Sequence, residues 1–292
     1  MKRFYRILLE WVLILFLFVL PGYGGEWVRV SWSPAELRQG EVLYVEVKTD
    51  KGVSSIEGDL DGSPIYFFKR DGGGLAGIVG VDIATLPGLH PLRVTLKDLE
   101  GRSYKRVFQV RVRKGMFGVQ RLTLPEKMVE LKGEVLKRVL EERRKVKEIL
   151  LKIRHEKFWH NPFIKPVDGP ITGAFGLHRI LNGKPRSPHS GVDIGAPLGS
   201  EVVSCNDGIV VFAHELYLGG KTVIIDHGLG LYSIYMHLAQ IHVQEGQKVK
   251  AGDVIGLVGA TGRATGPHLH WGVRLMGARV DPFSLLVVFP GE

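Results

Sequence analysis

The sequence predicts a mainly β protein in which a long helix separates two β-rich parts. Residues 26–114 and the residues after 163 alternate apolar and polar side chains between closely spaced turns that contain Gly, Asp or Pro, and this pattern is typical of strands. Residues 125–159 instead repeat apolar residues at three- and four-residue steps, as amphipathic helices do. A chain of 292 residues with 45% hydrophobic residues can form one to three domains with substantial cores.

The chain opens with a basic and then apolar segment. Three basic residues precede an apolar run over residues 7–20, interrupted by Glu10 and followed by Pro21 and small residues up to Gly25. The run is shorter than the roughly 20 residues of a membrane span, and this arrangement is typical of a signal peptide. We therefore expect residues 1–25 to direct export to the periplasm or cell envelope. The alternative is an uncleaved N-terminal anchor that holds the protein at the membrane.

Residues 26–114 are predicted to form a β-sandwich of immunoglobulin type. Strands are expected at residues 28–32, 42–48, 65–69, 75–81, 89–96 and 104–112. Several short strands at this spacing favour a sandwich, although the cysteine pair of antibody domains is absent. The segment carries no cluster of catalytic residues, so we expect a spacer, a substrate-positioning module or a partner surface.

Residues 115–163 are predicted to be a helical connector. Their apolar stripe consists of Met128, Leu131, Val135, Val139, Val146, Ile149 and Ile153. It indicates one helix from Pro125 to about Trp159, weakened at Gly133 and interrupted at Glu142. Two roles are open, packing along a neighbouring domain and dimerisation through a coiled coil. The short and imperfect stripe favours packing.

Residues 164–292 are predicted to form a compact antiparallel β domain. Strands are expected at residues 201–204, 208–213, 222–226, 231–237, 254–259 and 268–274, with no helix of useful length. Trp271 and Phe283 are expected in its core, and a turn is expected at Asp281-Pro282. Cys205, the single cysteine, lies in an apolar run and is expected to be a buried filler.

Two histidine motifs in this last part indicate a metal site. They are His189-Ser190-Gly191-Val192-Asp193 and His268-Leu269-His270. Side chains alternate along a strand, so His268 and His270 should point to the same side. The segment with His189 and Asp193 can then complete a set of two histidines and one carboxylate. Such a set suits Zn²⁺ and leaves a fourth position open for water, as in catalytic zinc sites. The motifs therefore predict a hydrolase.

These motifs resemble those of the lysostaphin-type (LytM-type) zinc metalloendopeptidases of bacterial cell walls. Further matching segments are Gly173-Ala174-Phe175-Gly176, Asn182-Gly183-Lys184, Tyr235-Met236-His237-Leu238, Gly246-Gln247-Lys248-Val249 and Thr265-Gly266-Pro267. Together they cover about residues 164–285 in the family's order, and the resemblance implies an antiparallel sheet with an open groove above the metal. The residues before 164 resemble attachments of exported members of the family only loosely.

The resemblance implies a role for each matching residue. One zinc ion per chain would be bound by His189, Asp193 and His270. His268 and His237 would be the catalytic histidines beside a metal-activated water, and either imidazole can act as the general base. The loop before the metal motif would line the substrate groove. Its candidate groove residues are His178, Arg179 and Asn182.

The function implied is an endopeptidase that cuts peptide stems or cross-links of peptidoglycan. Cross-links between D-alanine and diaminopimelate and glycine bridges are both open as the bond cut. The alternative is a catalytically weak, zinc-containing wall-binding protein or amidase activator. Release of muropeptide fragments distinguishes the two. The five retained chemical positions favour the enzyme, because activators of this family are usually degenerate there.

The charge balance suits an anionic partner. The chain has 39 Lys and Arg residues against 30 Asp and Glu, for a net charge of +9. A basic surface is compatible with a bacterial cell wall or a membrane surface. No aromatic–basic or helix-turn-helix pattern is present, so no nucleic acid partner is expected. The sequence leaves open a cell-division or envelope partner and the oligomeric state.

Overall fold

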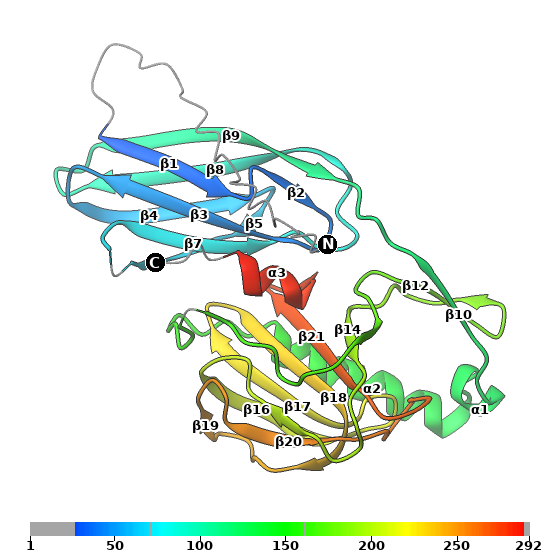
Figure 1. Ribbon diagram of the computed structural model, residues 1–292. Coiled ribbons are helices and arrows are strands. Elements are labelled where there is room, and N and C mark those ends of the chain that lie inside the picture. Colours follow the sequence, from blue (N-terminus) through cyan, green and yellow to red (C-terminus); the bar gives the residue numbers. More distant parts are fainter. Residues whose placement is uncertain (1–26, 71, 161, 289–292) are drawn as a thin grey trace, which may run out of the picture.

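The computed structural model describes residues 27–70, 72–160 and 162–288, so the expected signal peptide lies outside the described residues. Within them the protein is mainly β, which confirms the predicted fold class. Figure 1 shows two β-rich parts, one above the other, with the connector running down one side. None of the helices in the described ranges is both long and apolar enough to span a membrane. The domain boundaries drawn from the sequence stay predictions.

The first part contains two sheets that share one core. One sheet has the order β1 (Val28–Ser33), β3 (Val42–Thr49), β7 (Leu75–Gly80) and β6 (Tyr66–Lys69). The other has the order β2 (Glu36–Arg38), β9 (Ser103–Arg113), β8 (Gly88–Asp98), β4 (Val53–Leu60) and β5 (Ser63–Pro64). Val45 from the first sheet and Leu92 from the second are both fully buried in the shared core. The two sheets therefore form a sandwich, and its immunoglobulin type stays a prediction.

The connector differs from the single helix predicted from Pro125 to about Trp159, and that prediction is wrong. It contains a strand, β10 (Val119–Leu122), a single turn, α1 (Glu126–Val129), and one longer helix, α2 (Gly133–Leu150). Gly133 has a left-handed φ of +56°, a conformation that glycine adopts at little cost but that breaks a continuous right-handed helix. The sequence weakness at Gly133 is therefore the point at which the two helices separate.

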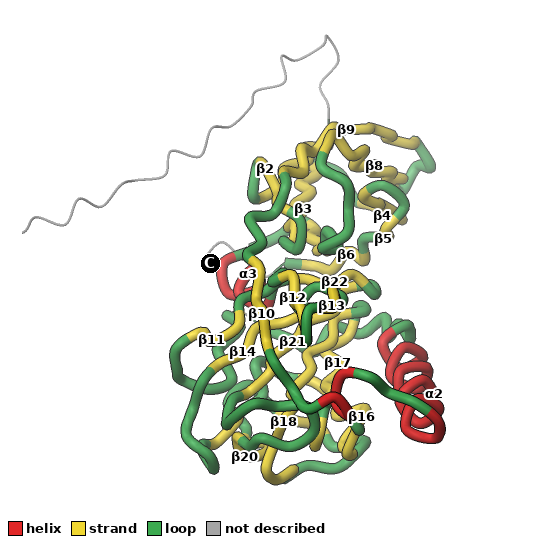
Figure 2. Tube along the Cα trace, turned by 90° about the vertical axis from the view of Figure 1, so that its right-hand side faces the viewer, coloured by secondary structure: helices red, strands yellow, loops and turns green. Residues whose placement is uncertain are grey.

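Helix α2 packs along the second part of the protein. Val146, Ile149 and Leu150 pack against a buried cluster that includes Phe212 and Tyr232, and Figure 2 shows α2 on the flank of the sheet. Glu142, which interrupts the apolar stripe, accepts a hydrogen bond of 2.9 Å from the backbone N–H of Tyr217. The structure therefore supports the packing role expected for the connector.

The second part is built on one large sheet. Its main path has the order β11 (Ile171–Gly173), β14 (Gly191–Ile194), β21 (Leu269–Leu275), β18 (Leu231–Ile241), β17 (Gly220–Gly228), β16 (Gly208–Leu216) and β19 (Lys248–Val249). The strands β15 (Glu201–Val203), β20 (Val254–Val258) and β22 (Ala278–Val280) join it off this path. A separate small sheet contains β10, β12 (His178–Leu181) and β13 (Lys184–Pro185). The connector thus contributes a strand beside the domain that carries the histidines.

The expected core residues are found in place. Trp271 and Cys205 are fully buried, and the Trp271 and Phe283 rings lie 6.1 Å apart. The turn predicted at Asp281-Pro282 is instead the start of a short helix, α3 (Pro282–Val287). Asp281 accepts a hydrogen bond from the Phe283 N–H, and proline tolerates the first helical position. Asp281 therefore caps a helix at this position, where the sequence predicted only a turn.

The two parts are joined by a continuous apolar core near the C-terminal end of β21. Ile78 of the first part belongs to the same buried cluster as Val280 and Leu285 of the second. Arg279 beside them donates hydrogen bonds of 3.0 Å and 2.6 Å to the Asp82 carboxylate.

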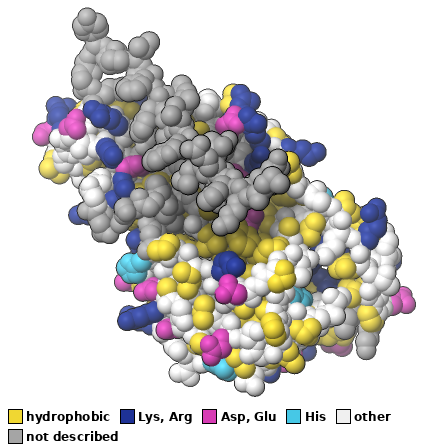
Figure 3. All heavy atoms as spheres, in the orientation of Figure 1, with side chains coloured by type: hydrophobic (Ala, Val, Ile, Leu, Met, Phe, Trp, Pro, Cys, Tyr) yellow, Lys and Arg dark blue, Asp and Glu magenta, His cyan; other side chains and the backbone are white. Residues whose placement is uncertain are grey.

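On the face shown in Figure 3, basic side chains are interspersed with acidic ones over both parts.

Trp159 is predicted to be a major stabilising residue of this junction. Its side chain is fully buried, and its ring centroid lies 5.0 Å from that of Phe68 in the first part and 5.8 Å from that of Phe163 in the second. Replacement of Trp159 by Ala should lower the free energy of unfolding by about 3–5 kcal/mol. Chemical denaturation measures this, with the exposed Leu86→Ala as control. A loss below about 1 kcal/mol would show that the residue is not central to the core.

Candidate metal centre

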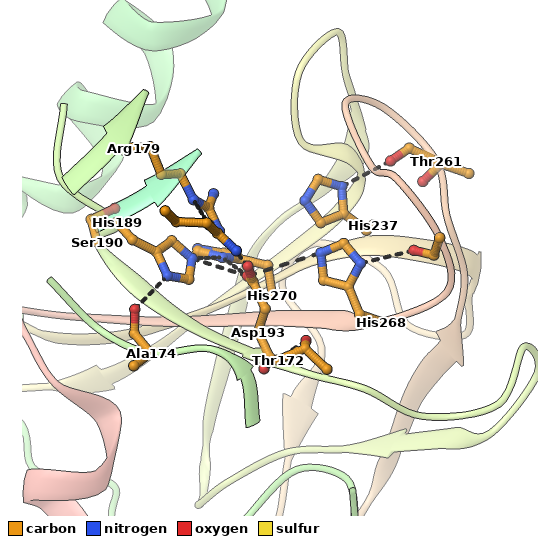
Figure 4. Close-up of polar contacts among 12 residues, drawn as sticks. Thr172, Ala174, Arg179, His189, Ser190, Asp193, His237, Thr261, His268 and His270 are labelled. Atoms are coloured by element: carbon orange, nitrogen blue, oxygen red, sulfur yellow. Dashed lines mark hydrogen bonds and ion pairs between the residues drawn. The ribbon is translucent and has the colours of Figure 1, made fainter. Parts of the chain in front are cut away.

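The two histidine motifs meet because their strands are paired. β14 and β21 run antiparallel, with Asp193 directly opposite His270. Directly opposite residues in an antiparallel pair project to the same face and lie close together. His189 precedes β14, and its backbone N–H donates to the Leu177 carbonyl at 2.9 Å. Local pairing therefore carries the three predicted ligands to one place, as Figure 4 shows.

The side chains of His189, Asp193 and His270 converge on one point. Asp193 Oδ1 lies 2.8 Å from His270 Nδ1 and 3.0 Å from His189 Nε2. The ligand atoms of the three residues all lie within 4.8 Å of one another. Two nitrogen donors and one carboxylate oxygen at this separation fit a zinc ion and leave coordination positions unfilled by protein.

Backbone contacts hold His189 in the tautomer that binds a metal. His189 Nδ1 lies 2.8 Å from the Ala174 carbonyl oxygen and donates its proton there. Nε2 is then free of a proton and faces Asp193, which is the usual arrangement of a metal-binding histidine. His189 thus has the hydrogen bonding that a zinc ligand needs.

The protonation states also suit a cation. Burial alone would raise the pKa of Asp193, but its close contacts with His189 and His270 hold that pKa well below its ordinary value. Burial lowers the pKa of His270 to about 4, against the favourable hydrogen bond with Asp193. Near neutral pH Asp193 is therefore a carboxylate and His270 a neutral imidazole, which are the forms that bind divalent metals.

Two glycines of the motifs are required by close packing. A Cβ atom at Gly191 would lie 2.5 Å from the Trp271 carbonyl oxygen and 2.8 Å from His270 Nε2. A Cβ atom at Gly173 would lie 2.5 Å from Asp193 Oδ2. Side chains at either position would displace a predicted ligand, so these glycines shape the site.

His268 and His237 lie beside the three ligands and face each other. Their ring centroids are 4.8 Å apart, and His268 Nε2 is 3.9 Å from Asp193 Oδ1. Each ring has its Nδ1 within 2.9 Å of a backbone carbonyl, that of Gly266 for His268 and that of Thr261 for His237. Donation from Nδ1 leaves Nε2 of both rings able to accept a proton. Figure 4 shows the two rings side by side.

His237 is held in an unusual backbone conformation. Its φ of +65° is left-handed, which is rare for a residue other than glycine and is typical of functional sites. Its N–H donates to the Gly219 carbonyl at 2.8 Å. Burial, together with the closeness of the His270 and His268 rings, which would repel a second positive charge, lowers the pKa of His237 to about 3. The ring is therefore neutral near pH 7.

The three candidate groove residues have distinct places. Arg179 Nη2 donates to Asp193 Oδ2, and its Nε donates to Gln120 Oε1 at 3.0 Å. The His178 ring packs beside Phe117 at 6.3 Å. Contact with substrate stays a prediction for all three.

Asn182 and Gln120 make contacts that sequence reasoning did not anticipate. Asn182 exchanges hydrogen bonds of 2.9 Å and 2.8 Å with the backbone of Leu124 in the connector. Gln120 lies in the segment predicted as helical connector, and no motif marks it. Only the pairing of β10 with β12 brings Gln120 to Arg179.

His227 is a buried histidine outside the predicted ligand set and is expected to make stability depend on pH. The ring is buried, with Nδ1 2.7 Å from the Asp207 carbonyl and Nε2 2.7 Å from Ser233 Oγ. Burial lowers its pKa to about 4, whereas an unfolded histidine titrates near about 6.5. Between these values the unfolded chain binds more protons. The contribution of His227 is therefore complete above pH ~6.5 and falls by up to about 3 kcal/mol as pH drops to ~4.

The His227→Gln variant should lack this dependence. The difference in unfolding free energy between wild type and variant is expected to shrink from pH 7 to pH 4. Denaturation of both proteins with a chelator present measures it, since the other histidines then contribute equally to both. Parallel profiles would contradict the assignment.

Residues 187–282 match the family model described as Peptidase family M23. The chain is 43% identical over 119 residues to the peptidoglycan DD-endopeptidase ShyA of Vibrio cholerae, which covers 40% of this chain and 28% of that protein. It is 41% identical over 122 residues to the DD-carboxypeptidase/endopeptidase Mpg of Neisseria meningitidis, covering 41% of this chain and 28% of that protein. The chain thus spans little more than a quarter of the length of these curated relatives.

A solved structure extends the similarity to most of the chain. The crystal structure described as a peptidase M23 from Pseudomonas aeruginosa superposes with a TM-score of 0.66. It is 31% identical in sequence, and the alignment covers 87% of this chain and 96% of that one. The similarity therefore includes the β-sandwich and the connector as well as the part with the histidines.

Proposed function

Because this chain belongs to peptidase family M23, we propose that it is an exported zinc metalloendopeptidase that hydrolyses peptide stems or cross-links of peptidoglycan. Membership of the family confirms the resemblance seen in the sequence motifs. The observation that carries the proposal is the convergence of His189, Asp193 and His270, with His268 and His237 beside them.

The chain's residues divide the work of amide hydrolysis between them. When bound, zinc would lower the pKa of a coordinated water to about 7 and polarise the substrate carbonyl. His189, Asp193 and His270 would hold the ion through Nε2, Oδ1 and Nδ1. The Nε2 atoms of His268 and His237 face the same space, so either can accept the proton of the attacking water.

The proton then has a route to the leaving group. The imidazole that takes it can return it to the amine nitrogen as the peptide bond breaks. The carbonyl contacts of Gly266 and Thr261 keep both rings oriented through this cycle. Such fixed orientation lowers the barrier, because the reacting groups need not be ordered during the reaction.

The substrate class and location are supported by the relatives and by the N-terminal sequence. ShyA is named as a peptidoglycan DD-endopeptidase, and Mpg as a DD-carboxypeptidase and endopeptidase. The basic and then apolar residues 1–25 support export, with the periplasm or cell envelope as the site of action. Peptidoglycan is present there.

Digestion of purified peptidoglycan sacculi tests the proposal. The purified protein should convert cross-linked muropeptide dimers into monomers, and mass spectrometry of the soluble products names the bond cut. Chelated protein should release none above background, and the His268→Ala variant should release them at least about 10²-fold more slowly. A zinc-loaded protein that releases no fragments would instead support a wall-binding or activator role.

A further inference from the structure

We propose that the connector completes the metal centre, in that Gln120 positions Arg179 and Arg179 holds Asp193 so that one carboxylate oxygen is presented to the metal. The inference rests on the proposed function only in requiring zinc at this site. Both Gln120 and Arg179 lie outside residues 187–282, which match the family model. They would thus extend the centre beyond the residues matched.

The first link is the pairing of two distant segments. β10 and β12 run parallel, with Gln120 aligned to Arg179. Arg179 Nε donates to Gln120 Oε1 at 3.0 Å, and its side chain is only one-quarter exposed. The planar guanidinium has donors in a fixed fork, so a partner on Nε sets the direction in which the terminal nitrogens point.

The second link joins the guanidinium to the predicted ligand. Arg179 Nη2 donates to Asp193 Oδ2, whereas Oδ1 faces His189 and His270 at 3.0 Å and 2.8 Å. The two oxygens therefore have separate partners. A carboxylate that binds through both oxygens fills two coordination positions. Occupation of Oδ2 by Arg179 leaves one oxygen for the metal and keeps a position available to water.

The third link is the attachment of the connector itself. Asn182 is bonded to both backbone groups of Leu124. Lys184 Nζ and Arg186 Nη2 donate to Glu130 Oε1 at 2.9 Å and 3.2 Å. These contacts hold the connector against the β12–β13 hairpin after Gln120, and a hydrogen bond of 2.9 Å from the His178 N–H to the Gly118 carbonyl holds it before Gln120. The placement of Gln120 is therefore built into the fold.

Zinc affinity tests the role of Gln120. Gln120→Met removes the acceptor at similar volume and should weaken zinc binding by up to about tenfold, because it loosens Arg179, the outer partner of the ligand Asp193. Gln120→Glu keeps an oxygen at that position and should bind zinc as wild type does. Arg121→Gln is the matched control, because neighbouring residues on a strand project to opposite faces. Competition with a chromophoric chelator gives the dissociation constants.

Cobalt substitution tests the role of Arg179. Four-coordinate cobalt(II) absorbs visible light more strongly than five-coordinate cobalt(II). Arg179→Met frees Asp193 Oδ2, so its cobalt form should absorb more weakly than the wild-type form. Unchanged zinc affinity in Gln120→Met, or an unchanged cobalt spectrum in a folded Arg179→Met, would overturn the proposal. Neither readout involves peptidoglycan, so their failure is distinguishable from failure of the proposed hydrolase function.

Discussion

The His270→Ala variant should lose both bound zinc and hydrolytic activity. His270 Nδ1 lies 2.8 Å from Asp193 Oδ1 and 2.9 Å from His189 Nε2, so its loss leaves two ligands and a buried carboxylate with one partner fewer. Since the metal supplies several kcal/mol of transition-state stabilisation, kcat/KM should fall by about 10³-fold or more.

Elemental analysis and turnover on a purified cross-linked muropeptide measure the two losses. His242→Ala is the matched control, because this histidine is exposed and its Nε2 lies 3.2 Å from Gln240 Oε1, a residue outside the predicted ligand set. It should keep one zinc per chain and wild-type turnover. A His270→Ala protein that retains stoichiometric zinc would contradict the assigned ligand set.

The His268→Ala variant should separate catalysis from metal binding. His268 Nε2 lies 3.9 Å from Asp193 Oδ1, farther than the 2.8 Å and 3.0 Å of the two histidine ligands. Loss of a general base typically lowers the rate by about 10²–10⁴-fold. We expect kcat to fall within this range while zinc remains at one ion per chain.

The same two assays judge this prediction. Loss of zinc to the level of His270→Ala would make His268 a ligand. Retention of wild-type kcat would remove it from the proton transfer and leave His237 as the base.

Much of the site was predictable because its signals are local. The spacing of His268 and His270 indicates a shared side, since a strand alternates its faces every residue. The structure brings both rings toward Asp193, with Nε2 of His268 at 3.9 Å and Nδ1 of His270 at 2.8 Å. The antiparallel pairing that places Asp193 opposite His270 depends on residues 75 positions apart or more, and became predictable only through the family resemblance.

Strands with weak apolar alternation were missed by the sequence analysis. β4 (Val53–Leu60) has only intermediate or exposed side chains except at Leu60, so it lacks the alternating apolar face that predicts a strand. β14 was also not predicted as a strand, although its motif was recognised. It is buried at all four positions and has no polar face to reveal its period.

The connector shows most clearly which contacts local sequence patterns cannot predict. Its helical repeat predicted α2, but β10 is only four residues long and is exposed at alternate positions. Its pairing with β12 is a long-range contact, and no local property of Val119 to Leu122 indicates that partner. The role inferred for Gln120 therefore required the structure.

Titration of zinc into metal-free protein tests the central claim most directly. Hydrolysis of a purified cross-linked muropeptide would be followed as zinc is added in fractions of one equivalent per chain. If His189, Asp193 and His270 form one catalytic zinc site, activity should be absent at the start and reach a plateau at one equivalent. Full activity of the metal-free protein, or none at one bound equivalent, would contradict the account.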